Sequence, residues 1–393
     1  MAGETILQLG AGAWMKLTIQ RLKAAGYRVF AADKNPNAPA FPLADGHAAI
    51  DIVDADAIEA YARQIDADLV LVVNGAGVIS GATASARLDL PGLPVDVATR
   101  AQDKGACRDA WARARLAQPN YRVVEGPAQV AEACEVIGYP AVVKPTRAWG
   151  SRGVAIVRSP IEVDAVVSAT REENFDGPMI VERCVTGTEV SVEGLVQRGV
   201  TTVLAIGDKE MQDHPTYRVG MVLNYPTYLP HAPIAALCAD AIAAMGIENG
   251  AFDAEIMVDA TGAPYLLEIN PRPGGGHILG LVVEAVSGVN MPEAYAKILL
   301  GEAVDVRPRH QKGVCYKFFN APPGTFSGVS GLDAMKGMPG VLDASFDMVP
   351  GTSVGPIARD ADRPGFVVAA GETRDDAIAN ADRAIATLQF EMT

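Results

Sequence analysis

The sequence predicts a mixed α/β (α+β) protein that opens with a doubly wound parallel-sheet domain and closes with a small antiparallel-sheet domain. Three observations predict this class. Residues 1–100 alternate strand-like and helix-like segments, longer strands separated by Gly and Pro follow from residue 126, and residues 314–393 are rich in Gly and Pro. A chain of 393 residues suits two or three domains, and we place them at 1–100, 101–308 and 309–393.

The N-terminal segment has the βαβ order that is typical of a parallel sheet. Asp54 is expected to cap a helix, because Ile58, Tyr61 and Ile65 follow it at helical spacing. Strands that alternate with helices indicate a parallel, doubly wound arrangement. The other expected elements are strands at 4–10, 27–33 and 68–73 and a helix at 14–26.

The middle and C-terminal segments combine helices with antiparallel strands. Helices are expected at 103–117, 128–138, 160–172, 233–246, 283–301 and 375–388. Strands are expected at 141–144, 154–158, 178–185, 188–196, 200–209, 314–319, 345–348 and 365–371, with a hairpin between residues 252 and 270.

Composition excludes several classes of function. The net charge is −14 and there is no basic tract, so nucleic acid is not an expected partner. No apolar run approaches the ~20 residues that a membrane helix needs. Five dispersed cysteines without CxxC spacing indicate reduced thiols. Because the first residues also lack a signal-peptide pattern, we expect a cytoplasmic protein.

The predicted hairpin carries the strongest functional signal. Thr261-Gly262 predicts a two-residue turn between two β-rich runs. Counting outward from that turn places Glu255 opposite Glu268, and Asp253 opposite Asn270. Side chains two residues apart lie on the same face of a strand, so the three oxygen-bearing side chains of Glu255, Glu268 and Asn270 converge.

Converging carboxylates predict a bound cation. Directly opposed like charges destabilise a hairpin, and Mg²⁺ prefers hard oxygen ligands. We therefore expect Glu255, Glu268 and Asn270 to bind Mg²⁺. The alternative is a solvated hairpin face, which apolar neighbours such as Ile256 and Leu266 disfavour.

The segment LGAGAW near the N-terminus resembles part of a dinucleotide fingerprint. A strand, a GxG turn, a helix and then Asp33 follow the expected order, but Met15 stands where a third small residue belongs. A tight turn between strand and helix is the favoured interpretation, and NAD binding is the alternative.

A second group of residues indicates a nucleotide pocket. Lys144 ends a short strand just before a loop that contains Gly150 and Gly153, where backbone N–H groups can approach phosphates. The strand that ends at Glu182, with Val185 beyond it, can offer backbone groups to an adenine edge, and Glu189 can reach a ribose. Together with Lys104 and the hairpin, these residues describe an ATP pocket.

The order of these motifs resembles the ATP-grasp superfamily. DKGACRD, PAVVKP, the glycine loop, VERCVTGTEVSVEG, AEIMV and LLEINPRPGG stand in family order over nearly the whole chain. Within that superfamily the chain is most similar to carboxylate–amine ligases of the L-amino-acid ligase type, which are related to biotin carboxylase and PurK-type enzymes. The implied fold is an ATP-grasp domain with a mobile lid at about 125–185, between a pre-ATP-grasp domain and a C-terminal domain.

The resemblance also implies a role for each site residue. The phosphates of ATP would contact Lys104 and Lys144, under a loop that includes Gly150, Ser151 and Gly153. The adenine would contact Glu182 and Val185, and the ribose Glu189. Magnesium, or Mn²⁺ in its place, would bind Glu255, Glu268 and Asn270. Arg272 would neutralise the acyl phosphate and the tetrahedral intermediate, while Lys209 and Gly276 would lie near the acceptor substrate. His277 has the residue type to orient a substrate carboxylate or to help deprotonate the amine; the alternative is a loop histidine that bonds the backbone.

The implied reaction couples a small carboxylate to an amine through an acyl phosphate, with release of ADP and phosphate. Two alternatives stay open: a carboxylase that activates bicarbonate, and a nucleotide-binding relative without activity. Biotin carboxylation is disfavoured because Arg147 and Trp149 interrupt the glycine loop and no Met-Lys-Met acceptor motif occurs. The family also suggests a possible homodimer.

Overall fold

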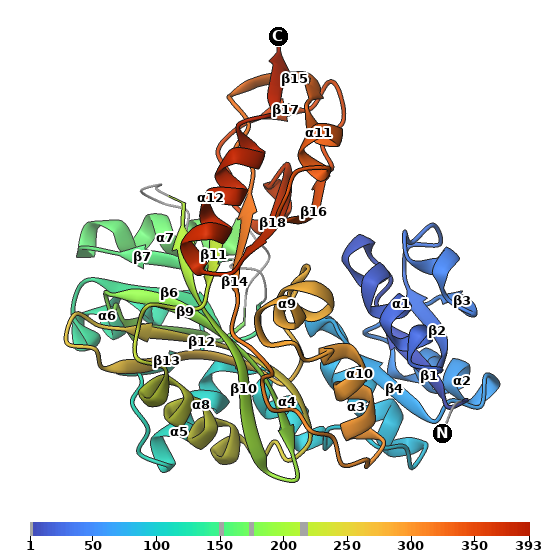
Figure 1. Cartoon of the computed structure of the whole chain (residues 1–393). Helices are drawn as coiled ribbons and strands as arrows, with labels where there is room; N and C mark the ends of the chain where they lie inside the picture. Colours follow the sequence, from blue (N-terminus) through green and yellow to red (C-terminus); the bar gives the residue numbers. More distant parts are fainter. Residues whose placement is uncertain (1–2, 149–152, 173–176, 213–218) are drawn as a thin grey trace.

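The computed structural model describes residues 3–148, 153–172, 177–212 and 219–393 (Figure 1). Its N-terminal sheet is parallel with the strand order β3-β2-β1-β4. The strands are β1 (Thr5–Leu9), β2 (Arg28–Asp33), β3 (Gly46–Ala49) and β4 (Leu69–Val72), with helices α1 (Lys16–Ala24), α2 (Ala55–Gln64) and α3 (Val78–Arg87). The Asp54 carboxylate accepts hydrogen bonds from the backbone N–H groups of Asp56 and Ala57, which confirms the predicted cap.

A four-stranded antiparallel sheet forms the region that the sequence predicts as a lid. Its order is β5-β8-β6-β7. Helices α4 (Val95–Ala101) and α5 (Lys104–Arg113) lead into it. Its elements are β5 (Tyr121–Val124), α6 (Val130–Ile137), β6 (Ala141–Pro145), β7 (Ala155–Val157), α7 (Val163–Glu172) and β8 (Met179–Arg183). Helix α6 ends at Gly138, whose φ of +86° suits glycine.

The largest sheet has eight strands in the order β13-β12-β9-β10-β11-β14-β18-β16. The C-terminal strands are antiparallel, as predicted, and they continue this sheet because β14 pairs with β11. Its strands are β9 (Thr188–Gln197), β10 (Val200–Met211), β11 (Gly220–Tyr225), β12 (Gly250–Val258), β13 (Pro264–Asn270), β14 (Gly313–Phe318), β16 (Val341–Phe346) and β18 (Gly365–Gly371).

Helices and a smaller sheet complete the chain. Figure 1 shows α10 between the N-terminal sheet and the large sheet, and the C-terminal elements projecting away from both. The helices that remain are α8 (His231–Met245), the π-helix η6 (Ile278–Val282), α9 (Val283–Ser287), α10 (Met291–Leu299), α11 (Leu332–Lys336) and α12 (Arg374–Ile385). The smaller sheet has the order β17-β15-β19 (Ser353–Val354, Gly324–Ser330, Gln389–Met392). None of the helices in the described ranges combines the length and apolar character that a membrane span needs.

One predicted helix is wrong in its extent. The sequence predicts a continuous helix over residues 283–301, but α9 ends at Gly288, which has a φ of +76°, and α10 begins at Met291 after an Asn290 cap. A left-handed residue ends a helix, because the next backbone groups leave the helical path.

The hairpin register is confirmed where it matters, although the predicted turn is wrong. Glu255 lies opposite Glu268 and Asp253 lies opposite Asn270. Asp259 and Ala263 close the turn, which is therefore one residue longer than predicted. An irregularity in the ladder between Glu255 and Ile256 restores the register, so the two deviations cancel.

Candidate active site

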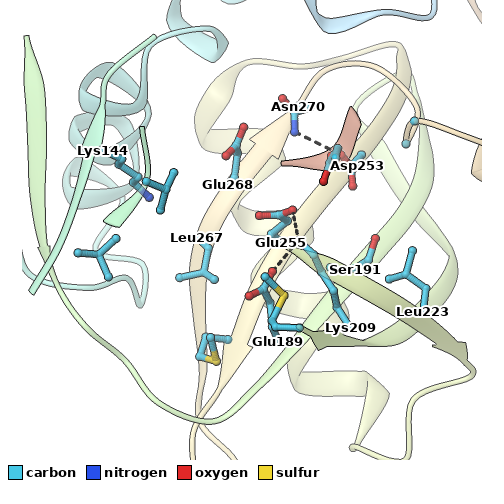
Figure 2. Close-up of a pocket in the computed structure, with 18 of the residues that line it drawn as sticks. Lys144, Glu189, Ser191, Lys209, Leu223, Asp253, Glu255, Leu267, Glu268 and Asn270 are labelled. Carbon is cyan, nitrogen blue, oxygen red and sulfur yellow. Dashed lines mark hydrogen bonds and ion pairs between the residues drawn. The ribbon is translucent and has the colours of Figure 1, made fainter. Parts of the chain in front are cut away.

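A cavity of about 390 Å³ lies where the lid sheet, the large sheet and the N-terminal domain meet. Its volume falls in the range of small-molecule sites. Figure 2 shows Lys144 from the lid sheet on one side of it, and Lys209 with acidic side chains from the large sheet on the other. The predicted site residues that border it are Lys104, Lys144, Glu182, Val185, Glu189, Lys209, Glu255, Glu268, Asn270, Arg272 and Gly276.

The hairpin strands β12 and β13 present three oxygen donors to this cavity. Figure 2 shows Glu255, Glu268 and Asn270 on the same side of the hairpin. Asn270 Nδ2 donates to Asp253 Oδ2 at 3.3 Å, which leaves the amide oxygen of Asn270 free to accept or coordinate. No group of three or more His, Cys, Asp or Glu side chains suited to a metal ion occurs in the described ranges. Two carboxylates and an amide fit Mg²⁺ as a partial shell that substrate phosphates and water complete.

Lys144, at the end of β6, belongs to a buried ion cluster. Its Nζ lies 2.8 Å from Glu182 Oε2, while Arg108 Nε lies 2.7 Å from Glu182 Oε1. Burial raises the pKa of Glu182, but the charges of Arg108 and Lys144 outweigh burial and lower that pKa to about 2. Burial lowers the pKa of Lys144, against the attraction of Glu182. The cluster therefore fixes the ammonium group on the cavity wall.

Arg108 was not among the predicted site residues. This side chain is 1% exposed and also donates to the carbonyl oxygens of Leu266 (2.7 Å) and Leu267 (3.1 Å), so it joins α5 to the hairpin. Its position four residues after Lys104 puts both cations on one helix face, but nothing in the sequence shows that the fold buries Arg108.

Lys104 approaches the β12–β13 hairpin from α5. Its Nζ donates to the carbonyl oxygen of Ala148 at 2.8 Å and lies 3.6 Å from Glu268 Oε2. Asp103 caps α5 by accepting from the Ala106 N–H. The cap sets where the helix begins, and Lys104 is its first residue.

Lys209, on β10, pairs with two acidic residues that the sequence assigned to different roles. Its Nζ lies 2.6 Å from Glu255 Oε1 and 2.7 Å from Glu189 Oε1, as Figure 2 shows. Burial lowers the pKa of Lys209, but Glu255 and Glu189 outweigh it and raise that pKa well above its usual value. Lys209 therefore stays charged and neutralises part of the acidic cluster.

Arg272, in the NPRPGG segment, is held by one acidic residue and one backbone carbonyl. Its Nη1 donates to the carbonyl oxygen of Pro273 at 2.7 Å and lies 3.4 Å from Asp253 Oδ2. Among the described residues, its buried Nε has no hydrogen-bond partner. The buried Glu193 carboxylate accepts from the Gly274 N–H at 3.1 Å and so anchors the next part of the segment.

Gly276 borders the cavity, and His277 follows it directly in the chain. Gly276 has a φ of +65°, and a Cβ at this position would lie 2.7 Å from Tyr316 Oη. Within the described part of the chain, the wall of the cavity does not include His277. The His277 ring packs against Phe366, with ring centroids 4.3 Å apart, and its Nδ1 lies 3.6 Å from Asp343 Oδ2. This placement shows His277 packed against Phe366, and its role towards a substrate stays a prediction.

The remaining predictions concern two turns. Asp33 accepts from the backbone N–H groups of Ala11 (2.9 Å) and Asn35 (3.0 Å), so its carboxylate stabilises the turn after β1 and is not placed to bind a ribose. This geometry supports the tight turn over NAD binding. Gly150 and Ser151 lie outside the described residues, and Gly153 has a φ of +68°.

Comparisons with known proteins agree with this geometry. Residues 137–280 match a family described as the ATP-grasp domain, and residues 317–393 match the L-amino acid ligase C-terminal domain 2. A D-alanine–D-alanine ligase from Anaeromyxobacter dehalogenans is 30% identical over 58% of this chain and 76% of that ligase. The uncharacterized protein y4rH from Sinorhizobium fredii is 27% identical over 78% of this chain, which spans 64% of its length. The structure of an L-amino acid ligase from Bacillus licheniformis has a TM-score of 0.86 at 21% identity, with 100% of both chains covered.

Proposed function

Because these matches show that the chain belongs to the ATP-grasp family, we propose that it is an ATP-dependent carboxylate–amine ligase. It activates a small carboxylate as an acyl phosphate, couples it to an amine and releases ADP and phosphate. The observation that carries this proposal is the convergence, on one cavity, of Lys104 and Lys144 with the oxygen donors Glu255, Glu268 and Asn270.

The two lysines and the hairpin form the phosphate end of the cavity. In the first step a carboxylate oxygen attacks the γ-phosphorus of ATP and the β–γ bridging oxygen leaves with ADP. Positioning and charge stabilisation supply most of the catalysis in phosphoryl transfer. Lys144 contributes a fixed cation, since Glu182 and Arg108 hold it in place. A magnesium ion held by Glu255, Glu268 and Asn270 would supply further positive charge.

Arg272 serves the second step. The amine nitrogen attacks the carbonyl carbon of the acyl phosphate, the tetrahedral oxyanion collapses, and phosphate leaves as the amine loses a proton. A guanidinium can pair with two phosphate oxygens at once, which a lysine cannot. The contacts of Arg272 through Nη1 with Asp253 and Pro273 leave its other N–H groups for this task.

Adenosine would occupy the side of the cavity bordered by Val185 and Glu189. The carboxylate of Glu182 is engaged by Arg108 and Lys144. Any contact of Glu182 with adenine would therefore use its backbone. A homodimer stays a prediction, which light scattering would test.

Trapping of the acyl phosphate tests the proposal without knowledge of the natural amine. Hydroxylamine attacks an acyl phosphate to give a hydroxamate and phosphate. Mg-ATP, hydroxylamine and a panel of amino acids and small carboxylates should give ADP and the hydroxamate of at least one acid, identified by mass. The Arg272→Met variant should lose the hydroxamate, whereas Arg113→Met, an exposed change on α5, should keep it. Absence of any hydroxamate from a folded protein that binds ATP would reject the ligase.

A further inference from the structure

The cavity continues beyond its phosphate end onto the C-terminal region. Phe318 at the end of β14, together with Asp360 and Arg363 around the short helix η7 (Asp360–Asp362), borders the same space as Arg272. None of these three residues has a role in the phosphate chemistry proposed above.

Arg363 is a largely buried cation with unused donors. Its side chain is 13% exposed, and its guanidinium carbon lies 3.9 Å from the centroid of the Phe318 ring. One of its terminal nitrogens, Nη2, pairs with the Asp360 carboxylate. Its Nε is buried and has no hydrogen-bond partner in the part of the chain that the structure describes. Because arginine carries five N–H donors, the single pairing with Asp360 leaves this group under-used.

A row of aromatic rings separates Arg363 from the NPRPGG segment. Tyr316 Oη lies 2.7 Å from the place of a Cβ at Gly276, and the Tyr316 and Phe318 ring centroids are 4.6 Å apart. Arg363 covers the far side of this row, on Phe318. A small molecule that reacts beside Arg272 can therefore extend along the aromatic row towards Arg363.

We propose that Arg363 binds the carboxylate of the amine substrate, which is the carboxylate that is not activated. The inference rests on the proposed function. The reacting carboxylate must lie at the phosphate end, where it becomes the acyl phosphate, whereas an amino acid that acts as the amine keeps its own carboxylate. A planar guanidinium that already donates to the Asp360 carboxylate has the shape and charge to bind a substrate carboxylate. The Asp360 side chain is 47% exposed and can move into solvent when a substrate carboxylate replaces it.

A comparison of KM values for amino acids and for their carboxamides separates carboxylate binding by Arg363 from a structural role. A carboxamide has no carboxylate to activate, so it can act only as the amine. With Mg-ATP and one saturating carboxylate donor, the KM of each active L-amino acid is compared with that of its carboxamide. Charge-assisted hydrogen bonds contribute about 1.5–3 kcal/mol, so Arg363→Met should raise the amino-acid KM by roughly 10- to 100-fold. The KM values of the carboxamide and of ATP should change by less than about 3-fold, and Arg363→Lys should retain part of the affinity for the amino acid.

Arg359→Met is the matched control. Arg359 begins the same turn, is 59% exposed, pairs with Asp362 and does not border the cavity among the described residues. Equal increases in KM for amino acid and carboxamide, or a similar effect of Arg359→Met, would show that Arg363 only stabilises the turn. An effect confined to the donor would also overturn the inference. If the wild type releases no ADP with any pair of carboxylate and amine, the proposed function itself is wrong. If the wild type is active and Arg363→Met has the same KM for the amino acid, the inference about Arg363 is wrong while the proposed function stands.

Discussion

Replacement of Arg108 by Met tests the buried ion cluster that positions Lys144. Arg108 is 1% exposed, and its guanidinium contacts the Glu182 carboxylate and the carbonyl oxygens of Leu266 and Leu267. Met fills a similar volume but donates no hydrogen bonds. The variant therefore leaves a buried carboxylate paired with Lys144 alone and removes a donor from the carbonyl groups of Leu266 and Leu267.

Two independent arguments give the size of the effect. Removal of one partner from a buried ion pair costs about 3–5 kcal/mol. Burial raises the pKa of Glu182, but Arg108 and Lys144 together lower it from 4.5 to about 2, a difference worth about 3 kcal/mol that the two cations share. Burial lowers the pKa of Lys144, which offsets part of that gain. We therefore expect Arg108→Met to lower the free energy of unfolding by about 3 kcal/mol.

Urea unfolding and thermal melting measure this loss. For a unit of about 200 residues the expected fall in melting temperature is roughly 10 °C. Arg113→Met is the control, because Arg113 is exposed in the last turn of the same helix and its loss should change stability by less than about 0.5 kcal/mol. If Arg108→Met unfolds at the same urea concentration as Arg113→Met, the cluster does not stabilise the fold and our reasoning about Glu182 is wrong.

Three further outcomes follow from the site. The lowered pKa of Glu182 adds stability at pH values above its unfolded pKa of 4.5, and that stability is lost as the pH falls towards about 2. Between pH 5 and pH 2.5 the free energy of unfolding should therefore fall more steeply for the wild type than for Glu182→Gln. Equal slopes for the two proteins would contradict this. Gly276→Ala should cost roughly 1–2 kcal/mol in thermal unfolding, because φ is +65° and Tyr316 Oη is close, whereas Gly275→Ala, with no atom within 4 Å of its Cβ, should be near neutral. Glu268→Gln should slow ADP release by roughly 100-fold or more and raise the Mg²⁺ concentration that gives half-maximal activity; near-normal ADP release would refute the metal assignment.

Much of the fold was predictable because local patterns determine it. Alternating strands and helices gave the parallel sheet, and Asp54 and Gly138 marked a helix start and a helix end that the structure confirms. The register of Glu255 and Glu268 was confirmed for a partly accidental reason. The turn is one residue longer than predicted, and an irregular pairing beside Ile256 compensates for it.

Other features depend on contacts that a single sequence does not display. Gly288 breaks a helix whose apolar pattern continues through it. Strand β11, which the sequence pattern does not predict, pairs with β10 on one side and with β14 on the other. Arg108 has the ordinary sequence context of an exposed helical arginine, and only the fold buries it against Glu182. His277 has the residue type of a catalytic base, yet tertiary packing directs it towards Asp343.

The most direct test of the central claim is product analysis with purified protein. Mg-ATP is combined with pairs of amino acids and small carboxylates, with and without bicarbonate, and ADP, phosphate and the mass of every product are measured. The account predicts ADP and phosphate release that requires both a carboxylate and an amine, in equal amounts with an amide of matching mass. ADP release that depends on bicarbonate without an amine, or no turnover by a folded protein that binds ATP, would contradict it.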